Sequence, residues 1–261
     1  MMKTLKKLIL VLFAVVVAWA QNVNDLRVPC SHHGSFSSWA FGVSYMKSSL
    51  EGVNRRTENV ARSVQPDGSS AVTAEYVVER ERRDEFSGFG TPLIDFRYGY
   101  FVGKAVALYL GFAGSLYWGE GSYFRENRGI DYAYELDGVK KNLRYASGNE
   151  YYKDDAVGVF GSFGFGISVY PFYKWTTELK DVHAGLAWGW DATVAKIKGA
   201  SDNTNGFTGY FLRFDVGKDW WVSEDCLMGI GFSYTNAFGT DDYGSDGKDH
   251  RFGLFFRITR E

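Results

Sequence analysis

Cysteine, histidine and proline are scarce in this chain. Its 261 residues include two cysteines, four histidines and four prolines. Two cysteines exclude a small scaffold held together by several disulfides. Few prolines leave long segments free to pair as strands, because each proline removes a backbone donor from a sheet. Glycine and aromatic residues are abundant instead, with 31 glycines and 18% Phe, Trp and Tyr. This mixture favours a strand-rich protein with large side chains on one face and small ones on the other.

The first 20 residues have the composition of an export signal. Lysines at positions 3, 6 and 7 precede an apolar run from Leu8 to Val17, and Ala18-Trp19-Ala20 follows. This order predicts a secretory signal peptide over residues 1–20 that is cleaved before Gln21, which leaves residues 21–261 as one domain. The predicted signal contains basic residues and no acidic ones, so the mature chain is mildly acidic. It has no basic stripe that would favour nucleic acid.

The segment from Lys104 to Gly119, KAVALYLGFAGSLYWG, is the longest apolar run beyond that signal. It is shorter than the roughly 20 residues that a membrane-spanning helix needs. Large residues such as Leu108, Leu110 and Phe112 occupy its even positions, and mostly small ones occupy its odd positions. Only a strand keeps every second side chain in one environment. The run is therefore predicted to be a strand with one apolar face.

Eight segments share this alternation, and in all of them the bulky aromatic residues are on one face. The segments are residues 36–46, 93–102, 104–119, 155–170, 181–195, 207–217, 226–236 and 250–261. The opposite face has small residues and a set of charges predicted to form a network inside the barrel, namely Asp95, Arg97, Asp191, Arg213, Asp215, Arg251 and Arg257. Apolar residues outside and charges inside are the arrangement of a transmembrane barrel. The predicted fold is an all-β, antiparallel, up-and-down barrel of eight strands.

The connections alternate between short and long. Turns are predicted at Gly103–Lys104 and at residues 217–219, and long outer loops at residues 47–90, 119–154, 196–206 and 239–249. One segment, Ser70 to Glu81, also has strand character. We place it in the first long loop, paired with the stretch from Thr57 to Val64, and a ten-stranded barrel is the alternative. Short turns on one side and long loops on the other are expected of bacterial outer-membrane barrels.

The C-terminal segment RFGLFFRI carries a family resemblance. Arg251, Gly253, Phe256 and Ile258 occupy positions that resemble the C-terminal assembly signal of small outer-membrane barrels of the OmpA/OmpW-like, eight-stranded kind. The resemblance implies a Gram-negative cell envelope and residence in the outer membrane. It also implies contact with outer-membrane lipid and lipopolysaccharide, recognition by the barrel-assembly machinery, and possible binding of an extracellular ligand at the loops.

Candidate sites within the chain have structural interpretations that compete with chemical ones. His183 lies on the inner face, where a buried, hydrogen-bonded histidine is favoured over a catalytic one. The aspartates between Gly239 and His250 are predicted to form a solvated outer loop rather than a Ca²⁺ site, because the glutamate expected of such a loop is missing. Cys30 and Cys226 are both predicted at the periplasmic rim, where they could form a disulfide, and Cys30–His33 is predicted to be a lead-in rather than a metal site.

The sequence therefore favours a non-enzymatic outer-membrane barrel with a structural or surface-interaction role. A narrow, porin-like channel for ions or small polar solutes is the first alternative, and a lipid-modifying barrel enzyme is the second. No catalytic residue, metal or cofactor is expected. Fold alone does not choose among these functions, because function depends on loops and sites.

Overall fold

The computed structural model describes residues 31–64, 70–128, 131–136, 139–144, 148–175, 178–199 and 204–261. The predicted signal peptide and Cys30 therefore lie outside the described residues. No helix in the described ranges is long and apolar enough to cross a membrane. The strands are β1 (Ser35–Val64), β2 (Ser70–Val102), β3 (Val106–Arg128), β4 (Asp131–Leu136), β5 (Val139–Arg144), β6 (Gly148–Val169), β7 (Val182–Ile197), β8 (Thr204–Trp221), β9 (Cys226–Thr240) and β10 (Asp246–Arg260).

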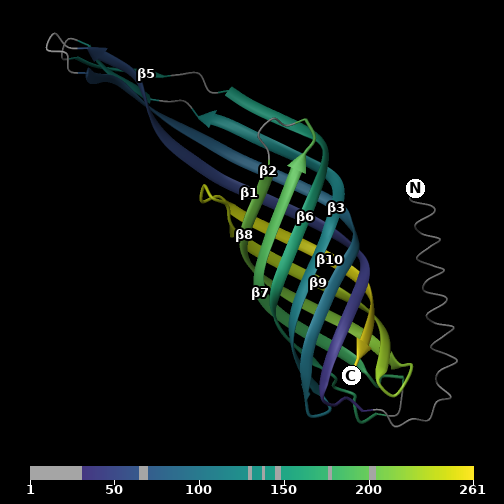
Figure 1. The fold of residues 1–261 in the computed structure, drawn as a ribbon. Coiled ribbons are helices and arrows are strands. Elements are labelled where there is room, and N and C mark those ends of the chain that lie inside the picture. The colour runs from purple at the N-terminus through teal and green to yellow at the C-terminus, as the bar shows by residue number, and fades with distance from the viewer. Residues whose placement is uncertain are drawn as a thin grey trace.

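Eight of these strands form a closed ring. The order is β1-β10-β9-β8-β7-β6-β3-β2, and pairing of β1 with β2 completes it. Every neighbouring pair is antiparallel, and β1 meets β10 over a long register from Ser37↔Arg260 to Glu51↔Asp246. Figure 1 shows the tilted strands of the barrel, with the C terminus at the end that we call the lower end. The prediction of an eight-stranded antiparallel barrel is confirmed, and its eight segments belong to the eight ring strands.

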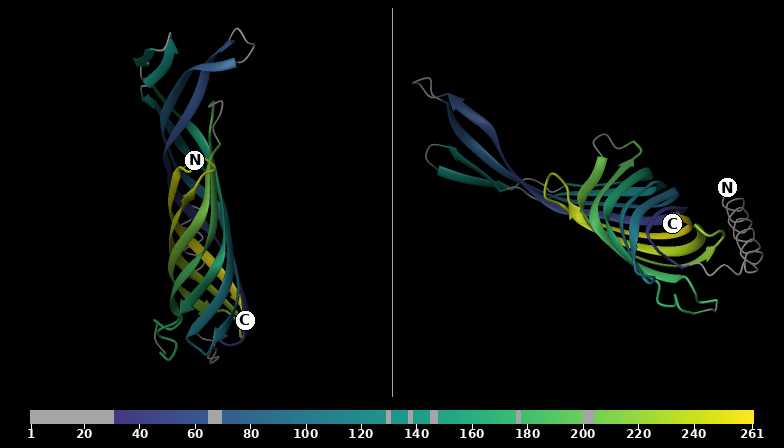
Figure 2. Two further views of the ribbon diagram at one scale, coloured as in Figure 1. Left: turned by 90° about the vertical axis from the view of Figure 1, so that its left-hand side faces the viewer. Right: turned by 60° about the horizontal axis from the view of Figure 1, so that its bottom comes forward.

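The sheet continues beyond the upper end of the ring, which corrects the predicted long loops. β1 and β2 remain paired as far as Val64↔Ser70, and β3 and β6 remain paired as far as Asn127↔Gly148. β4 pairs with β2, and β5 pairs with β4. Figure 2 shows this extension standing away from the barrel. The expected pairing of Thr57–Val64 with the segment after Ser70 is present, but most of residues 47–90 and 119–154 are strand. The many charges in these two segments favoured loops in the sequence analysis. Strands that are surrounded by water, however, can have polar residues on both faces.

One predicted turn is also wrong. Residues 217–219 lie within β8, where Lys218 is the register partner of Val182 and Trp221 that of Leu227. The connection instead covers residues 222–225. The Gly-Lys-Asp sequence resembles a turn, but pairing on both sides holds it in the sheet. At Gly103, by contrast, the predicted turn is present, with a positive φ of 74° that glycine adopts without strain.

The two faces of the barrel wall differ as predicted. The outer face exposes large apolar residues, among them Trp39, Phe112, Trp188 and Trp190. The interior contains small residues, charges and a few large rings such as Phe160. An eight-stranded ring leaves an interior just wide enough for side chains to fill it. This interior, which we call the lumen, is where the sequence places its charges.

Candidate functional site

The lower part of the lumen contains four charges of balanced sign. Asp95 and Arg97 come from β2, and Arg213 and Asp215 come from β8 on the other side of the ring. Arg97 Nη2 lies 3.0 Å from Asp95 Oδ2 and 3.1 Å from Asp215 Oδ1, and Arg213 Nη2 lies 2.6 Å from Asp95 Oδ2. Arg97 also donates a hydrogen bond to Tyr109 Oη. We call these four charged residues the lower network. Its two cations and two anions form ion pairs between β2 and β8 on opposite sides of the ring.

A second group of charges lies nearer the lower end. Arg257 Nη2 lies 2.6 Å from Asp219 Oδ2 and donates a hydrogen bond to His183, whose Nδ1 is 3.3 Å from the same carboxylate. All three side chains are buried. In the described part of the chain, no serine or threonine hydroxyl is hydrogen-bonded to His183. The surroundings of His183 therefore lack the nucleophile that a Ser-His-Asp site requires.

The N-terminal lead-in covers the lower end of the lumen. His32 is 2% exposed, with Nδ1 2.6 Å from Glu261 Oε1 and Nε2 3.5 Å from Asp181 Oδ1. Its ring packs against Phe101 and Tyr170, with centroids 4.6 and 4.2 Å away. Burial opposes protonation of His32, but its contacts with the carboxylates of Asp181 and Glu261 outweigh that effect and raise its pKa to about 9. At neutral pH the histidine is therefore a cation that ties the lead-in to the C-terminal residue.

A third charged group lies higher in the lumen and is not balanced. Arg251 Nη2 is 2.6 Å from Asp191 Oδ2, and Arg251 Nε is 3.0 Å from Asp249 Oδ2. Thr193 Oγ1 lies within hydrogen-bond distance of both carboxylates. We call Asp191, Asp249 and Arg251 the upper network. It places two carboxylates around one guanidinium, whose carbon also lies 3.9 Å from the centre of the Phe160 ring.

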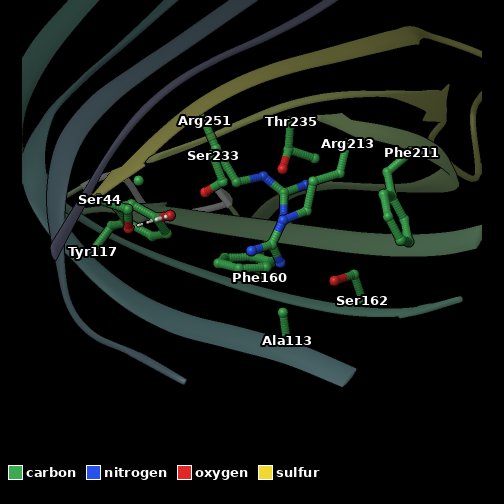
Figure 3. Close-up of a pocket in the computed structure, with 11 residues that line it drawn as sticks. Ser44, Ala113, Tyr117, Phe160, Ser162, Phe211, Arg213, Ser233, Thr235 and Arg251 are labelled. Carbon is green, nitrogen blue, oxygen red and sulfur yellow. Dashed lines mark hydrogen bonds between the residues drawn. The ribbon is translucent and has the colours of Figure 1, made fainter. Parts of the chain in front are cut away.

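A small cavity separates the lower and upper networks. Hydroxyl groups of Ser44, Ser162, Ser233 and Thr235 face it together with Arg213, as Figure 3 shows. Its volume of about 20 Å³ is room for roughly one water molecule. Arg213 Nε, which is buried, has no hydrogen-bond partner among the described residues. With room for about one water molecule, the cavity is not a section of an open pore.

Apolar side chains close the lumen around and above the upper network. Met46, Phe86, Tyr117, Phe160 and Ile197 belong to one buried cluster, and each is at most 5% exposed. Near the upper rim, Asp84 pairs with Arg82 and Arg125, and Arg82 also reaches Asp241. Charged groups and apolar groups thus follow one another along the whole lumen.

The seven charges that the sequence assigns to the lumen all lie inside the barrel, each at most 7% exposed. They form two separate networks together with one group near the lower end. Sequence reasoning missed Asp219 and Asp249, because one was assigned to a turn and the other to a solvated loop. Extending the strand alternation by two residues from Arg251 back to Asp249, and by four residues from Asp215 on to Asp219, would have found both. Asp249 is fully buried, which corrects its assignment to a solvated loop.

The remaining predicted sites concern the C-terminal strand and the cysteines. Arg251 and Gly253 face the lumen and Phe256 and Ile258 the outer side of β10, and their role as an assembly signal stays a prediction. Cys226 begins β9, and the backbone carbonyl of the adjacent Asp225 accepts a hydrogen bond from the backbone N–H of Glu261. Because Cys30 is outside the described residues, the disulfide also stays a prediction. Within those residues, no three His, Cys, Asp or Glu side chains are placed to hold a metal ion.

Comparison with known proteins gives similar folds and no family. No protein-family model and no curated protein matches the chain. Among solved structures, it is similar to the outer membrane protease OmpT from Escherichia coli (8% identity, TM-score 0.37, 87% of this chain and 96% of that one). It is also similar to the outer membrane protein OprG from Pseudomonas aeruginosa (10% identity, TM-score 0.33, 89% of this chain and 98% of that one). A third similar structure is Ail, the attachment invasion locus protein of Yersinia pestis, in complex with the heparin analogue sucrose octasulfate (14% identity, TM-score 0.33, 86% of this chain and 99% of that one).

The ring closure, the apolar outer face and the charged lumen define the class of this protein. It has the fold of a small outer-membrane β-barrel with eight strands in the ring. A fold of this class does not by itself select a function.

Proposed function

We propose that the protein is a non-enzymatic barrel of the Gram-negative outer membrane with a structural or surface-interaction role. The observation that carries this proposal is the filled lumen. Paired charges and apolar rings alternate along it, and the cavity between the two networks has room for about one water molecule. A solute therefore has no continuous route, and no nucleophile is hydrogen-bonded to His183 among the described residues.

The extended sheet supports a role outside the membrane. β1, β2, β3 and β6 run past the ring, and β4 and β5 widen the sheet that they form. A barrel that only filled the membrane would not need strands of this length. The proposal includes export by the signal peptide, assembly by the barrel-assembly machinery, contact with lipid and lipopolysaccharide, and binding of an extracellular ligand by the extension.

Planar-bilayer recording of the refolded protein tests the sealed lumen. We expect the wild type to give no stable conductance steps. The double variant Met46→Ala, Phe86→Ala removes two large side chains of the apolar cluster and should create conductance. Leu254→Ala is the matched control, because Leu254 is 51% exposed on the outer face of β10. Heat-dependent gel migration should first establish that each variant is a folded barrel.

A narrow channel is the second candidate, and the unpartnered Arg213 Nε beside the polar cavity is the observation that favours it. In that case the wild type should conduct in well-resolved steps, and Arg213→Met should abolish the steps while gel migration still reports a folded barrel. That combination would overturn the sealed-lumen proposal.

A further inference from the structure

A hollow of a different kind lies at the lower end of the barrel, and we call it the basal cavity. Three segments that are far apart in the sequence line it, namely the lead-in with Ser31 and His32, the turn between β2 and β3 with Lys104, and the connection between β6 and β7. It holds about 370 Å³, within the range of roughly 300–1,000 Å³ that small-molecule sites occupy. The basal cavity therefore has room for a small organic molecule.

The side chains that line the basal cavity carry an excess of positive charge. Lys104, Lys174 and Lys180 are its lysines, and Asp181 is its one acidic residue in the described part of the chain. Asp181 is already engaged, because its Oδ1 lies 3.5 Å from Nε2 of His32, which is a cation at neutral pH. The charges of this pair offset each other, and those of the three lysines remain. The ligand that such a cavity favours is an anion.

Two of the lysines are accessible to an anion. Lys104 and Lys174 are exposed, and neither forms an ion pair with another described residue. Nζ of Lys174 lies 5.5 Å from the centre of the Tyr173 ring, which also lines the cavity. A cation–π contact of this kind attracts the ammonium group to the ring without neutralising its charge. Both ammonium groups thus keep a charge that a ligand can neutralise.

Backbone hydrogen bonds fix the frame of the basal cavity. At the start of the β6–β7 connection, the N–H of Tyr170 donates to the carbonyl of Ala105, next to the β2–β3 turn (2.7 Å). At its end, the N–H of Asp219 donates to the carbonyl of Asp181 (3.2 Å). Within the described ranges, Asp181 is the one non-glycine residue with a positive φ, 61°. Such conformations persist where the surroundings fix them, and they cluster at binding and catalytic sites.

The number of cations favours a phosphate group over a carboxylate. A phosphate monoester carries a charge of about −1.5 to −2 at pH 7 and three strong acceptor oxygens. A carboxylate carries one charge on two oxygens. Lysine binds phosphate as a point charge, so lysines on two different segments can each contact a different oxygen of one phosphate group. The volume of the cavity leaves space for a small organic substituent beside that group.

We propose that the basal cavity binds a phosphate group, with Lys104 and Lys174 contacting its oxygens and Lys180 adding to the positive potential. The sources of that phosphate rest on the proposed function, which puts the lower end on the periplasmic side of the outer membrane. They are a small soluble phosphate ester of the periplasm and the head group of a phospholipid in the inner leaflet. Lysines at the rim of a membrane protein reach lipid head groups without any cavity. A hollow of this volume also admits a soluble ester.

Isothermal titration calorimetry of the refolded protein tests the proposal. The detergent is a maltoside and the buffer contains no phosphate, so that no other phosphate group competes. The probes are glycerol 3-phosphate and the dicarboxylate succinate, at equal ionic strength. We expect the wild type to bind glycerol 3-phosphate more tightly than succinate. Lys104→Met and Lys174→Met should each weaken this binding about tenfold, as when one charge-assisted hydrogen bond is lost.

Arg260→Met is the matched control variant. Arg260 is a cation at the same end of the barrel, where it is paired with Asp225, but it does not line the basal cavity. Its replacement should leave the affinity for glycerol 3-phosphate unchanged. Heat-dependent gel migration should first establish that every variant is a folded barrel.

A second titration distinguishes the two sources of phosphate. Phosphatidylglycerol is mixed into the micelles, and control micelles contain oleate of equal total charge. Weaker binding of glycerol 3-phosphate with phosphatidylglycerol than with oleate supports the site and assigns it to a lipid head group. Equal binding in the two kinds of micelle supports the site and assigns it to a soluble ester.

Three results would overturn the inference. They are no binding of glycerol 3-phosphate by the wild type, binding of succinate that is equally tight, and equal affinities in the two lysine variants and Arg260→Met. The proposed function is tested separately, by fractionation of the outer membrane and by bilayer recording. A correctly located, sealed barrel that does not bind glycerol 3-phosphate would refute the basal site and leave the proposed function intact.

Discussion

The lower and upper networks of the lumen solve the same problem in different ways. Both bury carboxylates and guanidinium groups inside the lumen. The lower network pairs two arginines with two aspartates, whereas the upper network has one arginine for two aspartates. Removing one partner from a buried pair leaves an uncompensated charge. The balanced network should therefore be sensitive to every single substitution, and the unbalanced one should tolerate the loss of an acid.

Unpaired carboxylate oxygens show the same difference, whereas the unpaired atoms of the lower network are nitrogens of Arg213. In the lower network, both carboxylate oxygens of Asp215 accept hydrogen bonds from Arg97. In the upper network, Oδ1 of Asp191 and Oδ1 of Asp249 have no hydrogen-bond partner among the described residues. A buried polar atom without a partner costs about 1–3 kcal/mol. The upper network thus has more acceptors than its donors satisfy, and its second carboxylate contributes less to stability.

The largest effect is expected from Asp215→Asn in the lower network. The change leaves Arg97 and Arg213 with only Asp95 to neutralise them, in a buried site. We expect the free energy of unfolding to fall by about 3–5 kcal/mol, as when one partner of a buried ion pair is removed. Urea-induced unfolding of the refolded barrel in detergent micelles, followed by tryptophan fluorescence, measures this loss.

The double variant Asp215→Asn, Arg213→Met is the control for charge balance. It removes one charge of each sign, so part of the lost stability should return. If the single and double variants are equally destabilised, the cost comes from lost packing and not from an unpaired charge, and the comparison of the two networks loses its basis.

How well the sequence predicts the structure of a segment depends on which physical constraints act on its two faces. Inside the membrane, alternation has a physical cause, because lipid selects one face and the crowded lumen selects the other. The eight ring strands and all seven predicted lumen charges follow from that pattern. Beyond the membrane neither constraint acts, so strand residues such as Arg82 and Arg83 have the composition of a loop. The strand pairing of β2 with β1 and β3 identifies them as strand.

The grouping of the charges was not predictable from the sequence. Asp95 and Arg213 are far apart along the chain, and they meet because β2 and β8 face each other across the lumen. The alternation of large and small residues shows which face of the sheet a residue occupies. It does not show how high in the barrel the residue lies relative to a residue on another strand, because that depends on the register of every strand between the two.

A smaller, pH-dependent effect is expected at the lower end, where His32 contacts Asp181 and Glu261 outside both networks. The pKa of His32 is about 9 in the folded protein, above the ordinary value of 6.5. A raised pKa stabilises the folded state fully below pH 6.5, and this contribution is lost as the pH rises through 9. Its upper limit is about 3 kcal/mol, from 1.4 kcal/mol per pKa unit. Because His32 belongs to the lead-in, the loss should release that segment and leave the ring intact.

Hydrogen exchange of the lead-in across pH 6–10 measures this release, after correction for the intrinsic pH dependence of exchange. Trp221, whose ring centroid is 5.4 Å from that of His32, provides a second signal by fluorescence. His32→Gln keeps a polar side chain but removes the titration. In this variant, the protection of the lead-in amides from hydrogen exchange should be low and independent of pH. Protection that is equal in the wild type and the variant at pH 6 would refute the role of the charge.

The smallest effect is expected from Asp249→Asn in the upper network. Arg251 keeps its contact with Asp191, and the asparagine carbonyl oxygen can still accept the hydrogen bond from Thr193. A threonine hydroxyl has a single hydrogen, so it satisfies only one of the two carboxylates at a time. Removing one buried negative charge relieves repulsion between Asp191 and Asp249, which offsets the lost contact with Arg251. We expect the free energy of unfolding to change by less than about 1 kcal/mol in either direction.

The same urea experiment measures this change beside that of Asp215→Asn, which is the matched substitution. Equal losses for the two variants would mean that both carboxylates are equally needed, and the distinction between a balanced and an unbalanced network would then be wrong.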